Sequence, residues 1–180
     1  MNKTVISIVT AVILAVGILV GLGYVQPFFG ANAFEDYSGV SQDDFLAYRN
    51  ELGFEISYPQ SFRAVESPDP SSPIRVSFSA SGRGIAEVVE ITVASENVQS
   101  LTADTIDSLD SQERKTLSQG KAFGKATVIS FEKEIAGEKI TVRLHYFECP
   151  SYNAILTSLI PVSLKQDLKM VNYMASTFKC

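Results

Sequence analysis

The alternation of apolar and polar residues is clearest over residues 139–161, which read as two β-strands joined by a short loop. Val142, Leu144 and Tyr146 mark one face of the first strand, and the residues between them mark the other. Residues 154–160 return as a second strand, rich in Ile, Leu and Thr. We expect the rest of the chain to be organised around this hairpin.

The same pattern predicts elements on both sides of the hairpin. Strands are expected over 45–48, 54–58, 74–79, 88–94 and 126–134, and turns or loops at 50–53, 66–73, 82–84, 120–124 and 136–138. A first helix is expected to begin at Thr102 as its N-cap, with Asp104 and Asp107 near its positive end. Ser163 is expected to cap a closing helix over 164–178. Strands joined by hairpin-sized loops predict an antiparallel β-sheet flanked by helices, which is the α+β class.

The N-terminus has a different pattern. Val5–Val25 contains no charged residue, and a helix of about 20 residues spans a bilayer core of ~30 Å. With Lys3 before it, the positive-inside rule keeps residues 1–4 in the cytoplasm and sends the rest across. We predict a transmembrane signal anchor over 5–25, with a secretory signal peptide cut after Ala33 as the alternative.

The rest of the chain then lies outside the cytoplasm in either case. Residues 26–44 are predicted to be a tether and residues 45–180 an extracytoplasmic domain. The predicted location is the cell membrane, with one pass and the N-terminus inside, and the alternative is secretion after cleavage at Ala33.

Composition narrows the classes of partner. The chain has a net charge of −5, and from Glu35 onward its 14 basic and 20 acidic residues leave −6. Nucleic-acid binding needs clustered cations, so we expect no nucleic-acid partner. The two cysteines, Cys149 and Cys180, match no zinc motif. The expected partners are the membrane, through residues 5–25, and a protein whose identity the sequence does not indicate.

Candidate chemistry is sparse. His145 is the only histidine, so a Ser-His-Asp or Cys-His site must use it. It follows Arg143 on a strand face that we expect a helix to cover, which favours a packed core histidine. Asp104, Asp107 and Asp110 recur at a spacing that can gather a divalent cation, although a solvated helix face explains them better. No catalytic, cofactor or phosphate-binding motif occurs. The prolines of 66–73 form either a loop that binds a partner or an ordinary variable loop.

Several stretches resemble PsbP-like domains, in the same order along residues 45–180. They are Tyr48-Arg49-Asn50, Gly53-Phe54-Glu55-Ile56-Ser57-Tyr58-Pro59 with Phe62, Gly124-Lys125-Ala126 through Phe147, and Met174-Ala175-Ser176-Thr177-Phe178-Lys179. Phe62 stands where the family usually has tryptophan, and Thr177 is inserted into the last motif. The resemblance implies an α/β/α sandwich around an antiparallel sheet. Photosynthetic members of the family are extrinsic subunits of photosystem II, and many bacterial relatives are exported or membrane-tethered.

These observations lead to one principal functional hypothesis and two alternatives. The principal one is a non-enzymatic extracytoplasmic module that docks on an envelope protein complex or binds a small ligand, without a cofactor. The alternatives are a hydrolase-type enzyme that uses His145 and a weak divalent-metal-binding protein. An open pocket that places His145 within hydrogen-bond reach of a Ser or Asp would favour the enzyme.

A disulfide between Cys149 and Cys180 is predicted from element lengths. The strand over 154–160 leads away from Cys149 for about 23 Å at ~3.3 Å per residue. A helix over 164–178 packed antiparallel on it returns about 22 Å at ~1.5 Å per residue. Cys180 therefore returns to the level of Cys149, in a compartment that permits the bond.

Overall fold

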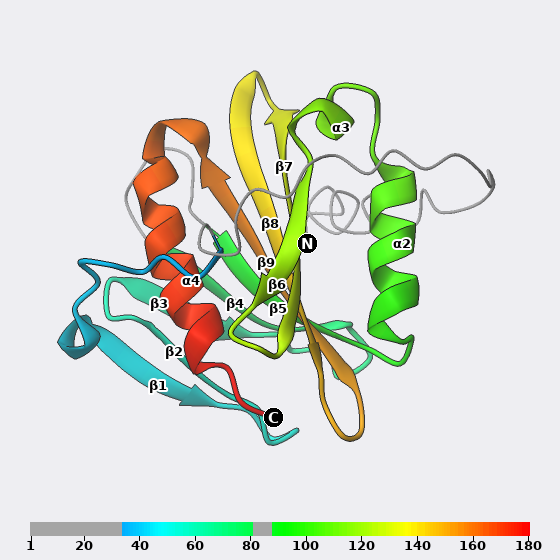
Figure 1. The fold of residues 1–180 in the computed structure, drawn as a ribbon. Coiled ribbons are helices and arrows are strands. Elements are labelled where there is room, and N and C mark those ends of the chain that lie inside the picture. The colour runs from blue at the N-terminus through cyan, green and yellow to red at the C-terminus, as the bar shows by residue number, and fades with distance from the viewer. Residues whose placement is uncertain (1–33, 81–87) are drawn as a thin grey trace.

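The computed structural model describes residues 34–80 and 88–180, which form a twisted antiparallel sheet with helices on both sides (Figure 1). The strands are β1 Phe45–Arg49, β2 Glu55–Pro59, β3 Phe62–Glu66, β4 Ile74–Ala80, β5 Val88–Ala94, β6 Ser118–Ala122, β7 Ala126–Ile135, β8 Glu138–Glu148 and β9 Asn153–Pro161. The helical segments are the 3₁₀ turns η2 Gln42–Asp44 and η3 Val162–Asp167 and the α-helices α2 Val98–Ser108, α3 Glu113–Thr116 and α4 Leu168–Thr177.

The main sheet has seven strands in the order β3-β4-β5-β9-β8-β7-β6, and β1 and β2 form a separate hairpin. Every neighbouring pair in the main sheet is antiparallel. The expected central hairpin, β8–β9, therefore lies in the middle of the sheet, and the α+β class is confirmed. The predicted transmembrane segment, residues 5–25, lies outside the described residues, and no helix within residues 34–80 and 88–180 is long and apolar enough to cross a membrane.

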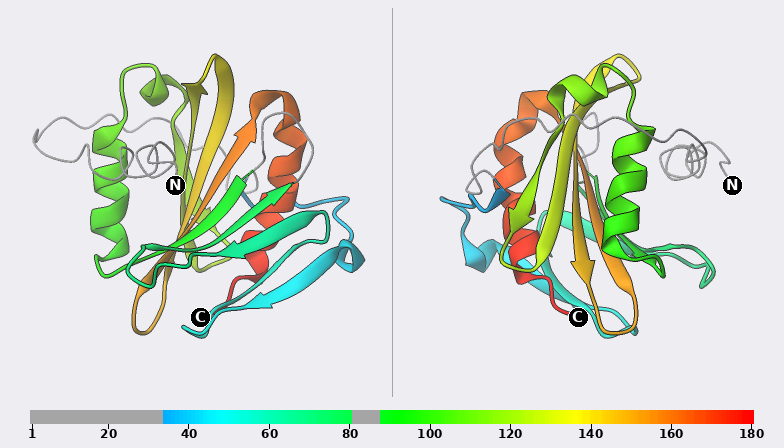
Figure 2. Two further views of the ribbon diagram at one scale, coloured as in Figure 1. Left: turned by 180° about the vertical axis from the view of Figure 1, so that it is seen from behind. Right: turned by 45° about the vertical axis from the view of Figure 1, so that its right-hand side comes forward.

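The two faces of the main sheet bury different clusters. On one face, α4 and the β1–β2 hairpin cover a core that includes Phe54, Ile56, Val76, Phe78, Val89, Ile91, Leu156, Val171, Met174 and Phe178. On the other, Val98 of α2 and Leu109 at its end pack in a second cluster with Ile129, Phe131, Ile140, Val142, Leu144 and Tyr146 of the sheet. Figure 2 shows α2 and α4 on opposite sides of the sheet. The predicted alternation in β8 is thus correct, and both of its faces are buried.

Two edge strands were not predicted. β3 lies at one edge of the sheet, just before the proline-rich loop, and β6 lies at the other edge. In β6, only Ala122 is both apolar and buried, so the segment lacks the alternation that marks a strand. Its Gly120 faces Phe34 so closely that an added Cβ would lie 3.0 Å from the ring.

Both helix starts differ from the predictions. Asn97, rather than Thr102, caps the first helix, because its Oδ1 accepts a hydrogen bond from the backbone N–H of Ser100 at 2.8 Å. Thr102 lies inside α2, where its hydroxyl donates to the carbonyl of Gln99 at 2.9 Å. Asp104 and Asp107 consequently lie beyond the first turn of the helix.

Ser163, the predicted N-cap of the closing helix, makes no capping hydrogen bond. The segment after Pro161 is the 3₁₀ turn η3, in which Leu164 has non-helical backbone angles (φ −113°, ψ 29°), and the α-helix begins only at Leu168.

Residues 34–38, which we call the strap, lie against α4 and the β6–β7 turn. Phe34 is buried, and the backbone N–H of Phe123 donates to Glu35 Oε1 at 2.6 Å. Asp36 forms an ion pair with Lys169 of α4 at 3.2 Å, and Asn172 Nδ2 donates to the carbonyl of Asp36 at 2.8 Å. The strap belongs to the predicted tether, residues 26–44, of which the structure describes residues 34–44.

Candidate functional site

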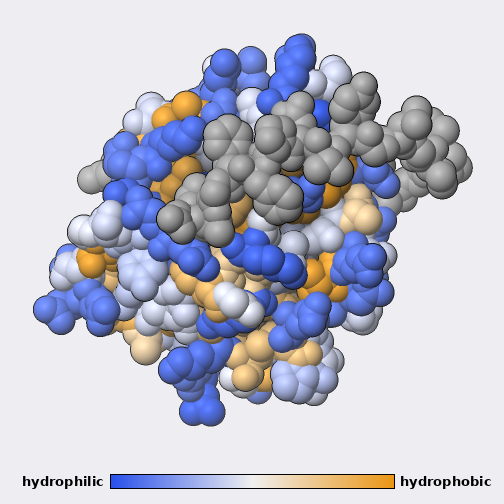
Figure 3. Space-filling view, in the orientation of Figure 1, coloured by the Kyte–Doolittle hydropathy of each residue, from blue (hydrophilic) through white to orange (hydrophobic). Residues whose placement is uncertain are grey.

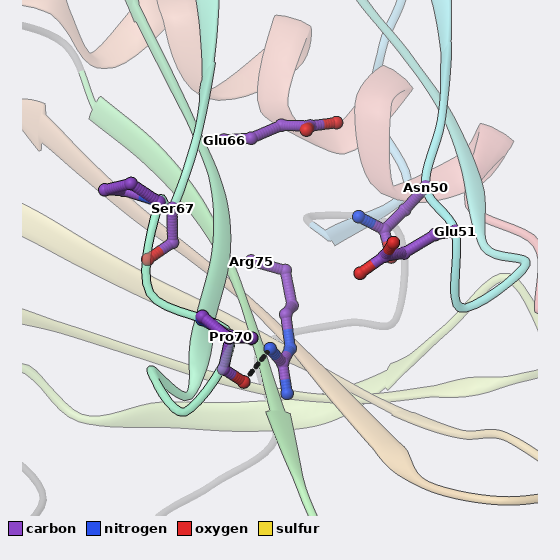
Figure 4. Close-up of a pocket in the computed structure, with 7 residues that line it drawn as sticks. Asn50, Glu51, Glu66, Ser67, Pro70 and Arg75 are labelled. Carbon is purple, nitrogen blue, oxygen red and sulfur yellow. Dashed lines mark hydrogen bonds between the residues drawn. The ribbon is translucent and has the colours of Figure 1, made fainter.

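A cleft lies between the turn of the β1–β2 hairpin and the proline-rich loop that joins β3 to β4 (Figure 4). Its volume is about 260 Å³, and its lining residues are Asn50, Glu51, Glu66, Ser67, Pro68, Pro70 and Arg75. We call it the proline-loop cleft.

The hairpin side of the cleft is a turn that the sequence predicts. Asn50 Oδ1 accepts from the backbone N–H of Leu52 at 2.9 Å, and the carbonyl of Asn50 accepts from the N–H of Gly53 at 2.9 Å. Gly53 has a φ of +93°, a conformation that glycine adopts without the steric cost of a side chain. The turn leaves Glu51 exposed at the rim.

The loop side is held by its own hydrogen bonds. Asp69 Oδ1 accepts from both the backbone N–H and the hydroxyl of Ser71, at 2.8 and 2.7 Å. These bonds lower the pKa of the Asp69 carboxyl. Arg75 of β4 reaches back and donates from Nη1 to the carbonyl of Pro70 at 2.8 Å. The contact fixes the guanidinium beside the proline segment, as Figure 4 shows.

Tyr48 of β1 connects the two sides. Its hydroxyl donates to Glu66 Oε1 at 2.7 Å and accepts from Asn50 Nδ2 at 3.2 Å. Burial raises the pKa of Tyr48 to about 12, and the hydrogen bond to Glu66 acts in the same direction. The phenol therefore stays protonated and remains a donor throughout the physiological range. This clasp holds the hairpin turn against the start of the loop.

The ionisable lining of the cleft consists of Glu51, Glu66 and Arg75. Arg75 Nε is buried and has no hydrogen-bond partner in the part of the chain that the structure describes. A buried donor of this kind costs free energy until an acceptor reaches it. The cleft is therefore equipped to bind a polar group through charge and hydrogen bonds.

The structure places His145 and Arg143 elsewhere, on the face of β8 that α4 covers, as expected. The His145 ring is 0% exposed, and neither ring nitrogen has a hydrogen-bond partner among the described residues. Burial lowers its pKa to about 3, with a smaller contribution from Arg143. The condition set above for an enzyme, an open pocket with a Ser or Asp bonded to this ring, is not met by this arrangement.

The three aspartates do not converge either. Asp110 lies just beyond α2, and its Oδ1 accepts from the backbone N–H groups of Gln112 and Glu113, at 2.7 and 2.8 Å. These bonds lower the pKa of the Asp110 carboxyl. Across residues 34–80 and 88–180, no group of three or more His, Cys, Asp or Glu side chains is arranged to hold a metal ion.

Cys149 and Cys180 form the predicted disulfide, with a sequence separation of 31 and their Cα atoms 5.6 Å apart. This separation lies in the usual range for a disulfide. The bond joins the β8–β9 loop to the last residue of the chain.

No family model and no curated protein sequence matches the chain. Several solved structures resemble it, among them the following two. One is LpqN of Mycobacterium tuberculosis, described as involved in cell envelope biogenesis, with 9% identity, a TM-score of 0.51, and coverage of 75% of this chain and 89% of LpqN. The other is the cyanobacterial PsbP protein CyanoP from Synechocystis sp. PCC 6803, with 14% identity, a TM-score of 0.48, and coverage of 79% and 95%.

The likeness to LpqN concerns the fold alone, and the named PsbP protein is similar at a lower score, in agreement with the expected PsbP-like architecture. At identities of 9% and 14%, these likenesses carry no residue roles from one chain to the other.

The sequence pointed to only part of the cleft. The prolines of 66–73 were noted as a possible partner-binding loop, but Asn50, Glu51 and Arg75 were not singled out. Arg75 alternates with apolar residues in β4 as any solvent-facing strand residue does. Only the position of the hairpin turn beside the loop shows that Arg75 lines the cleft.

Proposed function

We propose that this protein is a non-enzymatic binding module, tethered to the membrane through residues 5–25, which docks a protein partner outside the cytoplasm. The observation that carries the proposal is the proline-loop cleft. The Tyr48–Glu66 hydrogen bond holds the β1–β2 turn against the proline-rich loop there. Between them lies Arg75, whose Nε has no hydrogen-bond partner among the described residues.

The proposed compartment has support from the disulfide. Bonds such as Cys149–Cys180 persist in oxidising environments and are rare in the reducing cytoplasm. The uncharged stretch 5–25 supplies a means of retention at the membrane. LpqN, which has a similar fold, is described as involved in cell envelope biogenesis; an envelope role for this chain is part of our proposal.

The size of the cleft favours a protein segment over a whole small-molecule ligand. Its volume of about 260 Å³ is below the ~300–1,000 Å³ of typical small-molecule sites, and suits one or two side chains of a partner. Exposed apolar residues adjoin it in sequence: Leu52 is 43% exposed and Val65 is 48% exposed. Elsewhere the surface is mostly hydrophilic, with small hydrophobic areas, on the face that Figure 3 shows. A partner that gives Arg75 an acceptor and covers Leu52 fits this chemistry.

Site-specific crosslinking tests the proposal in the intact protein. A photo-crosslinking residue at Glu51, exposed on the rim, is expected to capture a discrete partner band in membranes. The same residue at Lys139, exposed at the far end of β8, is the control and should not. Adding R75Q to the Glu51 variant should reduce the band, because the guanidinium is lost. Equal capture at both positions, or a band that R75Q leaves unchanged, would contradict a docking role for the cleft.

A further inference from the structure

Arg143 is a buried cation whose partners in the described residues are neutral. Its side chain lies under α4, and the residue is only 7% exposed. Nη1 donates to Asn172 Oδ1 at 2.7 Å, and the guanidinium carbon lies 5.2 Å from the centre of the Phe34 ring. Arg143 Nε has no hydrogen-bond partner within residues 34–80 and 88–180. Its charge is therefore balanced by an amide oxygen and an aromatic face.

Further unpaired polar groups lie on the same face of β8. Thr141 and His145 flank Arg143 at two-residue spacing, and both are buried. The Thr141 hydroxyl and both His145 ring nitrogens lack hydrogen-bond partners in the described segments. Buried polar atoms are paired in the great majority of proteins, so a row of orphaned ones on one strand calls for an additional occupant.

The strands on either side of β8 place small side chains beside Arg143. Its register partners are Ser130 on β7 and Ser158 on β9, and both are buried. By contrast, His145 lies between Val128 and Leu156. The neighbours of Arg143 in the sheet are therefore smaller than those of His145, and they carry no charge.

Burial of this kind is costly for an arginine. A buried charge without an opposite charge is disfavoured by several kcal/mol in general, and burial lowers the pKa of Arg143 to about 10. The guanidinium is still charged at neutral pH. A neutral amide and one aromatic face offset only part of the cost of desolvation, because a cation–π contact contributes on the order of 1–2 kcal/mol.

The Phe34 ring is carried by a segment that can be released. The strap, residues 34–38, is not part of the sheet, and its ion pair from Asp36 to Lys169 joins two side chains that are each more than 40% exposed. Such exposed pairs contribute little stability. Two further hydrogen bonds hold the strap, from Phe123 N–H to Glu35 and from Asn172 to the carbonyl of Asp36, so its release breaks fewer hydrogen bonds than the removal of a strand from the sheet.

We propose that Arg143 and His145 form a binding site for a small oxyanion beneath α4, and that the occupant takes the place of the Phe34 ring. An oxyanion gives Arg143 Nε an acceptor and a compensating charge. The neutral His145 ring supplies one N–H donor to the same oxygen atoms. The ligand class is a single phosphate, sulfate or carboxylate group, and the docked Phe34 ring competes with it.

The test uses the full-length protein in detergent, with inorganic phosphate and sulfate as probes and chloride at matched ionic strength as the reference. With probe concentrations in the low millimolar range, too dilute for the general stabilisation that phosphate and sulfate give at high concentration, thermal unfolding should shift upward with either probe and not with chloride. F34A removes the competing ring and should bind the probes about tenfold more tightly by calorimetry. R143M replaces the cation with an apolar chain of similar length, and should fold but lose the response.

A second arginine variant separates this site from the proline-loop cleft. R75Q should keep the full response to phosphate and sulfate, because Arg75 lies in the other site. The proposal is overturned if F34A shows no binding of either probe, or if R143M responds as strongly as the unmodified protein.

Discussion

Lys179 and Glu55 pair as a two-residue antiparallel bridge, with each backbone N–H donating to the other residue's carbonyl at 2.9 Å. The bridge adds the end of the chain to β2, one residue before Cys180. Phe178, beside it, stacks between Phe54 and Phe147, with ring centroids 5.7 and 4.4 Å away. The C-terminus is thus held by backbone, aromatic and disulfide contacts, which is unusual for a terminus.

Loss of the disulfide should weaken the whole domain. The bond closes a loop with a sequence separation of 31, for which the chain-entropy model gives about 3–4 kcal/mol. We expect the double variant C149S/C180S to lower the free energy of unfolding in urea by up to that amount. The unmodified protein in reducing agent should match it. Two reactive thiols in the oxidised, denatured protein would contradict the bond.

The topology of the chain can be tested with fusion reporters. Lys3 and the uncharged segment Val5–Val25 predict that the C-terminus lies outside the cytoplasm. A reporter that is active only in the cytoplasm, fused after Cys180, should be silent, and activity from it would contradict the predicted location. Gel mobility separates the two forms, because cleavage after Ala33 removes the whole apolar segment.

The Tyr48 hydroxyl should stabilise the proline-loop cleft. Tyr48→Phe removes the hydrogen bonds to Glu66 and Asn50, and we expect a loss of about 0.5–1.5 kcal/mol with faster amide exchange at Leu52 and Gly53. Tyr58→Phe is a matched control, because Tyr58 also packs on Phe78. Equal effects of the two substitutions would show that the hydroxyl clasp is not important.

Sequence reasoning succeeded where residues alternate and failed where they do not. The central strands alternate because both of their faces are buried, so Val142 and its neighbours indicated β8 correctly. Edge strands bury fewer apolar side chains, and in β6 Ala122 is the only buried apolar residue. The disulfide was predicted although the last helix starts later than expected, because the 3₁₀ turn η3 covers part of the same length.

The sites were harder to predict than the strands. The proline-loop cleft joins Asn50, in the β1–β2 turn, to Arg75, in β4, and no motif links the two positions. The Arg143 site depends on Phe34, which the sequence assigned to the tether. In both cases the decisive contact is made between segments that are distant in sequence, and local patterns do not report such contacts.

The β7–β8 turn contains a strained alanine. Ala136 has a φ of +54° and Gly137 a φ of +83°, so both adopt the left-handed conformation of a two-residue hairpin turn. Asparagine tolerates this conformation better than alanine. We expect Ala136→Asn to stabilise the domain by about 0.5–1 kcal/mol in urea unfolding, and Ala136→Val to destabilise it. A less stable asparagine variant would contradict the argument.

His145 should make the domain sensitive to acid. Burial lowers its pKa to about 3 in the folded protein, whereas an unfolded histidine has a pKa of about 6.5. As the pH falls below about 6.5, the unfolded state binds the proton first, so stability is lost until the pH reaches about 3. Above pH ~6.5 this contribution is constant.

The matched comparison is His145→Leu, which removes the titrating ring and its unpaired nitrogens. Near pH ~4.5 the unmodified protein should have lost about 2–3 kcal/mol more stability, relative to pH ~7.5, than the leucine variant. Carboxylates titrate in both proteins and cancel in the difference. Urea unfolding across this range, in acetate and zwitterionic buffers with chloride as the only added salt, measures it. Acetate is itself a carboxylate, so F34A should be run alongside to detect any binding at Arg143. Parallel stability curves for the two proteins would mean that the His145 ring is not held neutral by burial.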